Sequence, residues 1–588
     1  MNDTASTIIN VASFGLKPNT GENAVHAVKK CIEALAEADG PCVLEFPNGQ
    51  YDFFPCELAK EKYYISNTAT EDENPDITKT IGILFKDKKN LTVEGNGSLF
   101  MFHGKMTMFA ADNCENIEIR NVITDFVRPT ISEMTVEAIK GDCLEVRVHP
   151  DSWYVIEDEK LYWVGEGWKF VDGPSQEFNP DKNTVWRVEN PVSSAIKVEE
   201  INPFHLRLYY QDVPQTKNGH VYQMRDGIRD QVGILLLKSK NISFDQVHIR
   251  YMHGLGIVGQ FSENLRFNKM NLSPDPKSNR TAAAFADFMH MSGVRGEISI
   301  TDSHFEGAHD DAINVHGTHL GIVDQPAANQ LVVRFMHGQS YGFDAFFTND
   351  TIEFLRSDSL TVYTENKVER AKPLNPREIL LTLEQNVHEE VKTGDVIENV
   401  SWAPEVKILS NHFSRIPTRG VLMTTPKKVL IKDNVFEGMF LSGILVACDA
   451  KSWFESGRVN DLEIIQNKFI ECGANGDPVI FINPENTVYD WKHPVHKNIL
   501  IEGNQFTLLS NTVLYAKSTQ NVAFIRNLLE GSQLVMEEYI KPLIHLSACS
   551  GVEIAENNMN TIRKSVLLEY MSEDNLSISG KQGLKYVK

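Results

Sequence analysis

The sequence predicts an all-β protein: a right-handed parallel β-helix with an N-terminal capping helix and two inserted small β-barrel domains. Three observations predict this fold. A strand-and-turn segment recurs along the 588 residues, one amphipathic helical segment precedes it, and two strand-like stretches interrupt it. Recurrence with a period of roughly 20 to 50 residues is typical of a solenoid. Alternation of apolar and polar residues within the segment indicates strands rather than helices.

The recurring segment is a short alternating strand, a turn with asparagine, and a second apolar pair. Asn241 and Asn264 are 23 residues apart, as are Asn411 and Asn434, and longer gaps indicate inserted loops. Because asparagine tolerates left-handed backbone and can pair its side-chain amides, we expect these residues to stack as a ladder in the turns. Segments that show the repeat are Asn116–Phe126, Asn241–Tyr251, Asn264–Leu272, Glu297–Gly307, Val406–Ile416, Val429–Met439, Leu462–Cys472, Ile499–Leu509 and Val552–Ile562.

The open end of a solenoid core needs a cap. The segment Gly21–Ala38 predicts one, because Val25, Val28, Ile32 and Leu35 form an apolar stripe at helical spacing. The flanking sequences INVASFGLKPNTGEN and VLEFPNGQYDF resemble the N-terminal cap of pectin-lyase-like β-helix enzymes. That resemblance indicates a fold superfamily rather than a substrate.

Two stretches, Val127–Arg229 and Thr318–Ala403, are strand-like but lack the repeat. They resemble each other, since Leu144–Tyr154 parallels Leu331–Tyr341, which predicts two copies of one small β-barrel. The predicted domains are 1–126 (N-terminal β-helix with the capping helix), 127–229 (first barrel), 230–317 (central β-helix with the catalytic candidates), 318–403 (second barrel) and 404–588 (C-terminal β-helix).

Composition limits the partners. A net charge of −22 repels nucleic acid and other polyanions, so neutral ligands are favoured. The sequence has no apolar run of eighteen or more residues, so no membrane span is predicted. The first ten residues lack the basic and apolar regions of a signal peptide. Eight cysteines lie far apart without a CxxC pair, which predicts isolated buried thiols and no zinc site.

Stacking the coils brings carboxylates together. Aligning Phe305 with Phe413 places Asp311 beside Arg419 on the next coil. Asp287 precedes Asp310 by 23 residues, one coil, so we expect those two aspartates side by side. Equivalent positions on neighbouring coils lie about 4.8 Å apart.

The alternation of the AHDDAINVHG segment decides which side chains face outward. If Ile313 points inward, Asp310, Ala312, Asn314 and His316 face outward, and Asp287 shares that phase if Phe288 points inward. Asp311 is then nominally inward. Because a buried unpaired carboxylate is costly, we expect Asp311 at a turn or paired with a cation.

An outward-facing acid cluster suits glycoside hydrolysis, in which one carboxylic acid protonates the leaving oxygen and a carboxylate activates water or attacks carbon. Neighbouring negative charges raise one pKa, so that one acid can stay protonated. The catalytic candidates are therefore Asp287, Asp310 and Asp311. The structural alternative is an Asp-Asp pair in a solvated turn. Arg419 argues against it, because its charge needs the aspartates or a sugar hydroxyl as a partner.

The candidate substrate-binding residues are Arg419, His253, His309, Asn314 and His316. The two histidines His253 and His309 fall on equivalent positions of aligned coils, and a structural role is their alternative. No metal-ligand spacing is present, so we expect no metal site. Aromatic candidates for stacking on a sugar, or else for filling barrel cores, are Trp163, Trp168 and Trp402.

Four segments carry a more specific resemblance: Phe46–Pro55, Ala286–Ile298, Glu306–Ile322 and Arg419–Pro426. Together they resemble glycoside hydrolase family 110, the bacterial α-1,3-galactosidases typical of gut Bacteroides. Members of that family remove terminal galactose from blood-group B antigen or from linear α-1,3-galactosyl glycans. The resemblance runs over essentially the whole chain, both inserts included.

The resemblance implies hydrolysis of a neutral, galactose-terminated glycan with inversion and without a cofactor. By motif, Asp310 and Asp311 correspond to the family's adjacent catalytic aspartates and Asp287 to the acid one coil earlier. We expect Asp310 to be the general acid, with Asp311 or Asp287 as the base. The resemblance also implies a periplasmic, secreted or cell-surface protein of a bacterium. The preference for branched or linear substrates stays open, as does the oligomeric state, with a homodimer as one option.

Three other functions are compatible with a β-helix. A polygalacturonase-type hydrolase also uses clustered aspartates, but the Arg-Ile-Lys type motif for a uronate carboxylate is missing and the charge opposes a polyanion. A lyase would need basic groups or calcium beside the acids, and no Lys/Arg cluster lies there. A non-catalytic carbohydrate-binding β-helix would use the same acids only as hydrogen-bond partners for hydroxyls.

Overall fold

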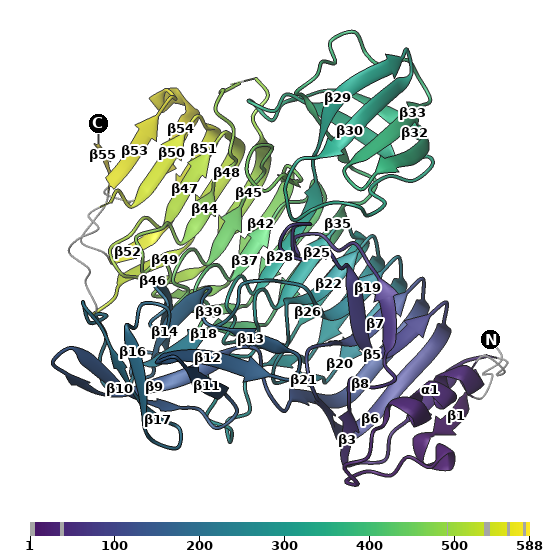
Figure 1. Cartoon of the computed structure of the whole chain (residues 1–588). Coiled ribbons are helices and arrows are strands. Elements are labelled where there is room, and N and C mark those ends of the chain that lie inside the picture. Colours follow the sequence, from purple (N-terminus) through teal and green to yellow (C-terminus); the bar gives the residue numbers. More distant parts are fainter. Residues whose placement is uncertain are drawn as a thin grey trace.

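The computed structural model describes residues 6–35, 40–490, 492–533, 541–560, 565–579 and 584–587. The body of the protein is a parallel β-helix that runs from the N-terminal cap to the C-terminal coils (Figure 1). The two inserts lie outside this body, the first at the lower left of the view and the second at the upper right. The predicted fold class is confirmed.

Each coil places strands in two large sheets. In one coil β20 (Lys240–Asp245) and β21 (His248–Ile249) join a 24-stranded sheet, and β22 (Leu255–Gln260) joins a 15-stranded sheet. All three pair in parallel with their counterparts one coil later. Strands of the 15-stranded sheet that lie around the candidate site are β19 (Val232–Leu237), β22, β25 (Met289–Ser292), β28 (Ile313–Thr318), β37 (Val421–Met423), β40 (Ile444–Val446) and β44 (Ile480–Ile482).

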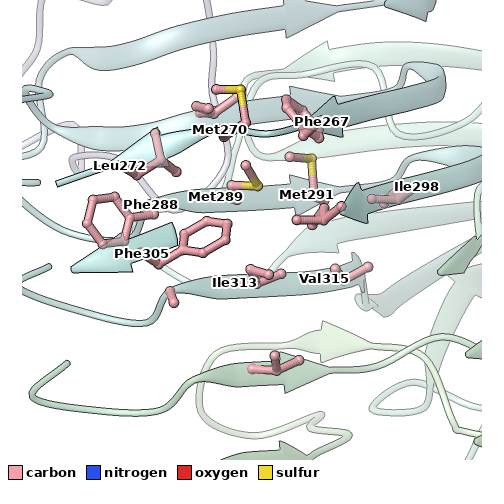
Figure 2. Packing of buried hydrophobic residues seen from close by; sticks show 14 of the residues in the cluster. Phe267, Met270, Leu272, Phe288, Met289, Met291, Ile298, Phe305, Ile313 and Val315 are labelled. Atoms are coloured by element: carbon pink, nitrogen blue, oxygen red, sulfur yellow. The ribbon is translucent and has the colours of Figure 1, made fainter. Parts of the chain in front are cut away.

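The core fills the inside of the coils. Figure 2 shows Met289 and Met291 of β25 and Ile313 and Val315 of β28 among the packed apolar side chains, all fully buried. Phenylalanines also repeat from coil to coil. The rings of Phe305, Phe413, Phe436, Phe469 and Phe506 stack in sequence, with centroids 4.8 to 5.0 Å apart.

The predicted asparagine ladder is confirmed, and there are two of them. An exposed ladder joins Asn90, Asn116, Asn241 and Asn264 by side-chain amide bonds of 2.8 to 2.9 Å, and these residues have left-handed backbone. In a second, buried ladder the residue with left-handed backbone is the one directly before each asparagine. Its members are Asn411, Asn434, Asn467, Asn504, Asn527 and Asn557.

Substitution Asn467→Ala should lower the free energy of unfolding by about 2 to 4 kcal/mol, because several buried groups lose partners. The Asn467 amide donates to Asn504 Oδ1 and the Ile431 carbonyl, and its Oδ1 accepts from Asn434. Denaturant unfolding measures the change. The exposed Asn558, changed to Ala, serves as the control and should stay within about 0.5 kcal/mol of wild type. Equal stabilities of the two variants would contradict a structural role for the ladder.

The predicted capping helix is α1 (Val25–Ala34), and residues 36–38 of the predicted segment lie outside the described residues. Val25, Val28 and Leu35 are buried as expected. The Asn23 side chain accepts a hydrogen bond from the backbone of Val25 at the start of the helix. Within the described part of the chain, none of the helices is long and apolar enough to cross a membrane. Seven cysteines are buried thiols, and Cys56 is exposed.

The inserts share a strand order, in agreement with the predicted duplication. The first sheet contains β14-β18-β9-β10-β17-β16 and the second β31-β34-β29-β30-β33-β32. Pairing of β31 with β32 closes the second into a barrel. Bounds in the first are β9 (Ser132–Lys140), β10 (Cys143–Val148), β14 (Ser175–Asn179), β15 (Thr184–Val188), β16 (Lys197–Asn202), β17 (His205–Tyr209) and β18 (Val221–Met224), with a separate sheet of β11 (Trp153–Glu157), β12 (Lys160–Gly165) and β13 (Trp168–Phe170). In the second they are β29 (Leu320–Ala327), β30 (Gln330–Phe335), β31 (Thr351–Leu355), β32 (Val362–Asn375), β33 (Glu378–Leu383) and β34 (Val396–Asn399).

Candidate active site

A pocket of about 210 Å³ opens on the outer face of the 15-stranded sheet, over β25, β28, β37 and β40. All three predicted catalytic aspartates line it, together with Arg419 and Asn314. The remaining lining residues are Asn67, Arg229, His290, Leu422, Leu445, Ala447, Asp449, Ser452, Trp453, Glu455 and Glu485.

The strand register corrects the predicted stacking of the aspartates. Met289 pairs with Ile313, and the backbone amide of Phe288 donates to the carbonyl of Asp311. Asp287 is therefore level with Asp311, and this coil is 24 rather than 23 residues long. Asp310 precedes that position in the turn before β28.

The predicted phase of Asp311 is also wrong. Ala312 and Ile313 both belong to the buried core, so the alternation slips by one position at the start of β28. Asp311 consequently lines the pocket instead of facing inward. The same slip occurs one coil earlier, where Phe288 and Met289 are both in the core.

Asp311 is paired with Arg419, as the alignment of coils predicts. Asp311 Oδ1 accepts from the backbone amide of Arg419 at 3.1 Å and from its Nε at 2.8 Å, while Oδ2 accepts from Nη2 at 2.7 Å. Gly420, which follows Arg419, lets this coil pack closely against the Phe436 ring, because a Cβ there would lie 2.5 Å from that ring. The fork of bonds compensates for burial of Asp311 and gives the carboxylate one orientation.

Asp310 receives its partner from the first insert. Arg187 of β15 donates from Nη2 to Asp310 Oδ1 at 3.1 Å. Burial opposes the charged form of Asp310, but the guanidinium groups of Arg187, Arg419, Arg229 and Arg225 outweigh it and lower its pKa below the ordinary value. Asp310 is thus an anion across neutral pH.

Substitution Arg187→Gln should raise the pKa of Asp310 and move the acidic limb of the kcat/KM profile to higher pH. We expect a shift of roughly half to one pH unit, because Arg187 is more than half exposed and its charge is screened. Substitution Arg147→Gln, at an exposed arginine of the same insert that pairs with Glu137, is the control. An acidic limb that coincides in the two variants would contradict the assigned influence of Arg187.

Asp287 has the opposite electrostatics. Burial raises its pKa well above the ordinary value, and the charges of Asp310 and Asp311 raise it further. Its Oδ2 lies 2.8 Å from Nδ1 of His290, whose Nε2 lies 2.8 Å from Nε2 of His316. These pKa directions favour Asp287 as the protonated acid, the reverse of the expected role of Asp310.

The other predicted binding residues divide into two groups. Asn314 lines the pocket and donates to Glu455 at 3.3 Å, and His316 lies behind it in contact with His290. His253 and His309 do not line the pocket: His253 is buried against Thr130, and His309 against Gln223. Their structural alternative is therefore the one that fits the geometry. The three predicted tryptophans, Trp163, Trp168 and Trp402, are also outside the pocket lining.

Trp453 is the aromatic residue of the pocket. The turn that presents it is organised by the Asp449 carboxylate, which accepts from the backbone amides of Lys451, Ser452, Trp453 and Phe454. The indole is 44% exposed and lies against the His337 ring of the second insert, with centroids 4.5 Å apart. An open aromatic face beside carboxylates suits a sugar ring.

Several residues that line the pocket or contact its acids were missed because they come from outside the repeat. Arg187 lies in the first insert, and the turn with Trp453 and β41 (Glu455–Ser456) is a loop between coils. Arg229, whose side chain donates to Gln339 of the second insert, is at the junction of insert and β-helix. His290, in contrast, could have been predicted from the sequence, because it is an outward residue of the strand that follows Asp287.

The pocket chemistry favours a neutral polyhydroxyl ligand. Six carboxylic acid side chains and two arginines line it, so a uronate would meet net negative charge. The pKa of Asp287 is raised and that of Asp310 is lowered, which favours the two states, protonated acid and anion, that hydrolysis of a glycosidic bond requires.

Comparison with known proteins agrees with this chemistry. Residues 132–222 match the domain description GLAA-B beta-barrel domain I, and residues 330–397 match GLAA-B beta-barrel domain II. The chain is 41% identical to an alpha-1,3-galactosidase A of Bacteroides thetaiotaomicron, over 92% of this chain and 94% of that protein. It is 36% identical to an alpha-1,3-galactosidase A of Akkermansia muciniphila (85% and 83% covered) and 33% identical to an alpha-1,3-galactosidase B of B. thetaiotaomicron (99% and 96%).

The β-helix and its pocket of differently protonated carboxyls define a glycoside hydrolase. More narrowly, the chain belongs to the α-1,3-galactosidase family.

Proposed function

We propose that this protein is an exo-acting α-1,3-galactosidase of glycoside hydrolase family 110 that inverts the configuration of the released galactose. The observation that carries the proposal is the pocket in which Asp287, Asp310 and Asp311 meet, with the pKa of Asp287 raised and that of Asp310 lowered. The names of the relatives supply the linkage and the sugar.

In this mechanism Asp287 is the general acid. As the bond from C1 to the glycosidic oxygen breaks, its electron pair goes to the oxygen, which takes the Asp287 proton. Asp310, kept anionic by Arg187, takes a proton from the attacking water. Asp311 holds the water together with Asp310, while Arg419 keeps Asp311 in place. General acid and general base catalysis each supply about 10²- to 10⁴-fold in rate.

The inverting outcome follows from this division of work. A water held by Asp310 and Asp311 attacks C1 directly, and galactose leaves without a covalent intermediate. Asp310 and Asp311 are suited to orient one water because each carboxylate is held by its own arginine, Asp310 by Arg187 and Asp311 by Arg419. Trp453 would contact the apolar face of the sugar, and Glu485 would accept from its hydroxyls.

Release of free galactose tests the function. The protein is incubated with an α-1,3-galactosyl disaccharide, with blood-group B trisaccharide, and with the α-1,4 and α-1,6 linkage isomers as matched controls. We expect galactose from α-1,3-linked substrates and at most traces from the isomers. Binding of the sugars without release would indicate a carbohydrate-binding β-helix instead, and release of galacturonate from polygalacturonate would indicate the polygalacturonase type.

Two further predictions extend the proposal to the cell. From the family resemblance we propose that the protein acts in the periplasm or at the surface of a bacterium, which fractionation of the native host tests. We also propose that it can form a homodimer. Light scattering coupled to gel filtration would contradict this if the mass at micromolar concentration equals the 66.3 kDa of one chain.

A further inference from the structure

Behind the pocket, three hydrogen-bonding contacts run in a line from Asp287 to the backbone. Asp287 Oδ2 contacts His290 Nδ1 at 2.8 Å, His290 Nε2 contacts His316 Nε2 at 2.8 Å, and His316 Nδ1 contacts the carbonyl oxygen of Gly317 at 2.6 Å. All three side chains are almost fully buried. The strands explain the line, since His290 and His316 are outward residues of the adjacent strands β25 and β28.

The carbonyl end of this line sets its direction. A carbonyl oxygen can only accept, so His316 Nδ1 carries a hydrogen, and in the neutral ring Nε2 is an acceptor. His290 Nε2 must then donate to it, which leaves His290 Nδ1 as an acceptor. A hydrogen bond from Asp287 to that acceptor requires a proton on the carboxyl group.

We propose that His290 and His316 are positioning residues that keep Asp287 protonated, through hydrogen bonds that all point from Asp287 toward the Gly317 carbonyl. This inference rests on the proposed function, because it explains how the acid of that reaction keeps its proton. If Asp287 loses the proton to the leaving oxygen, its carboxylate faces the lone pair of His290 Nδ1. That repulsion favours uptake of a new proton before the next turnover.

The surroundings of the line agree with a neutral His290 ring. Burial lowers the pKa of His290 well below its usual value, and the neighbouring His316 and Arg229 lower it further. Facing Asp287 are Asp310, Asp311 and Glu455, which disfavour its anion, and Arg229, which opposes them. Glu455 Oε1 lies 3.6 Å from His316 Nε2, beyond hydrogen-bond distance, and accepts instead from Asn67 and Asn314.

The opposite direction is the alternative state. There a cationic His316 would donate to His290 Nε2, and His290 Nδ1 would donate to an Asp287 carboxylate. It contains the same number of hydrogens and differs only in their positions. An experiment must therefore report on the protonation of Asp287 and not only on the presence of the contacts.

Substitutions His290→Asn and His316→Gln replace rings that have one donor direction by amides that can rotate. We expect the alkaline limb of the kcat/KM profile to move to lower pH by about one unit or more. Near neutral pH, kcat should fall about tenfold or more on an α-1,3-galactosyl disaccharide but less than about threefold on dinitrophenyl α-galactoside, whose leaving group needs no acid. The control is His496→Asn, a buried histidine of β45 (His496–Glu502) outside the pocket lining.

Equal losses on both substrates with an unmoved alkaline limb would overturn the proposal, and so would unchanged kinetics. Infrared difference spectra of the wild-type protein give a reading that needs neither histidine variant nor activity. We expect a protonated-carboxyl C=O band near neutral pH that disappears in Asp287→Asn. Absence of that band would refute the hydrogen-bond direction even if galactose is released, whereas its presence in a protein that releases none would refute only the proposed function.

Discussion

Substitution Asp287→Asn is expected to reduce kcat/KM on an α-1,3-galactosyl disaccharide by about 10³- to 10⁴-fold. A sugar leaving group departs as a poor alkoxide unless it is protonated, and Asp287 is the carboxyl whose pKa is raised. Asparagine keeps the shape and the contact toward His290 but has no proton of comparable acidity. On dinitrophenyl α-galactoside the same variant should lose less than about tenfold, because that leaving group departs unprotonated.

The control for this substitution is Asp302→Asn. Asp302 lies in the exposed turn between β26 (Arg295–Thr301) and β27 (His304–Glu306), and its left-handed backbone suits asparagine equally well. It should match wild type on both substrates. Losses of equal size on both substrates in Asp287→Asn would be incompatible with a role as general acid.

Substitution Asp310→Asn is expected to reduce kcat/KM by about 10³- to 10⁴-fold on both substrates alike. Activation of water is needed whatever the leaving group, and Asp310 is the carboxylate whose pKa lies below the ordinary value. The amide would still face Arg187 but could not accept the proton of the attacking water.

The two variants together separate the alternative assignments. If Asp310 were the acid, as the motif alone suggests, Asp310→Asn would spare the dinitrophenyl substrate and Asp287→Asn would not. Circular dichroism and thermal unfolding of both variants serve as folding controls. Burying an amide in place of an anion next to Arg187 and Arg419 should leave the β-helix signal unchanged.

The pH dependence follows from the same directions. The wild-type kcat/KM profile should be bell-shaped, with an acidic limb at which Asp310 gains its proton and an alkaline limb at which Asp287 loses its own. Variants therefore move separate limbs: Arg187→Gln the acidic one and His290→Asn the alkaline one.

The repeat made most of the fold predictable. Landmarks such as Phe305 and Phe413 recur because this position of each coil faces the apolar core, and aligning them placed Asp311 beside Arg419 correctly. The asparagine turns were predictable because asparagine also recurs at matched positions of successive coils. The cap followed from helical spacing of Val25, Val28 and Leu35.

Where the prediction of the site failed, the physical cause is local. The alternation slips where two consecutive residues, Ala312 and Ile313, both enter the core, so Asp311 faces the pocket. The coil that begins at Asp287 is 24 rather than 23 residues long, so the prediction placed Asp287 beside Asp310 instead of Asp311. No regular pattern marks Arg187, which contacts Asp310, or Trp453, which lines the pocket, since both come from segments outside the repeat.

The inserts accordingly have a role in the site. The first supplies Arg187 to Asp310, and the second supplies His337 against Trp453 and Gln339 to Arg229. The β-helix alone provides the stacked acids, while the first insert adds a positive charge beside Asp310 and the second contacts Trp453 and Arg229.

The stereochemistry of the first product tests the central claim most directly, namely that Asp310 and Asp311 activate a water while Asp287 protonates the leaving oxygen. Proton NMR recorded during the first minutes of hydrolysis of an α-1,3-galactosyl disaccharide distinguishes the anomers before they equilibrate. The mechanism predicts β-galactose as the first product. Appearance of α-galactose first would contradict it, because retention requires one of these carboxylates to bond to the sugar.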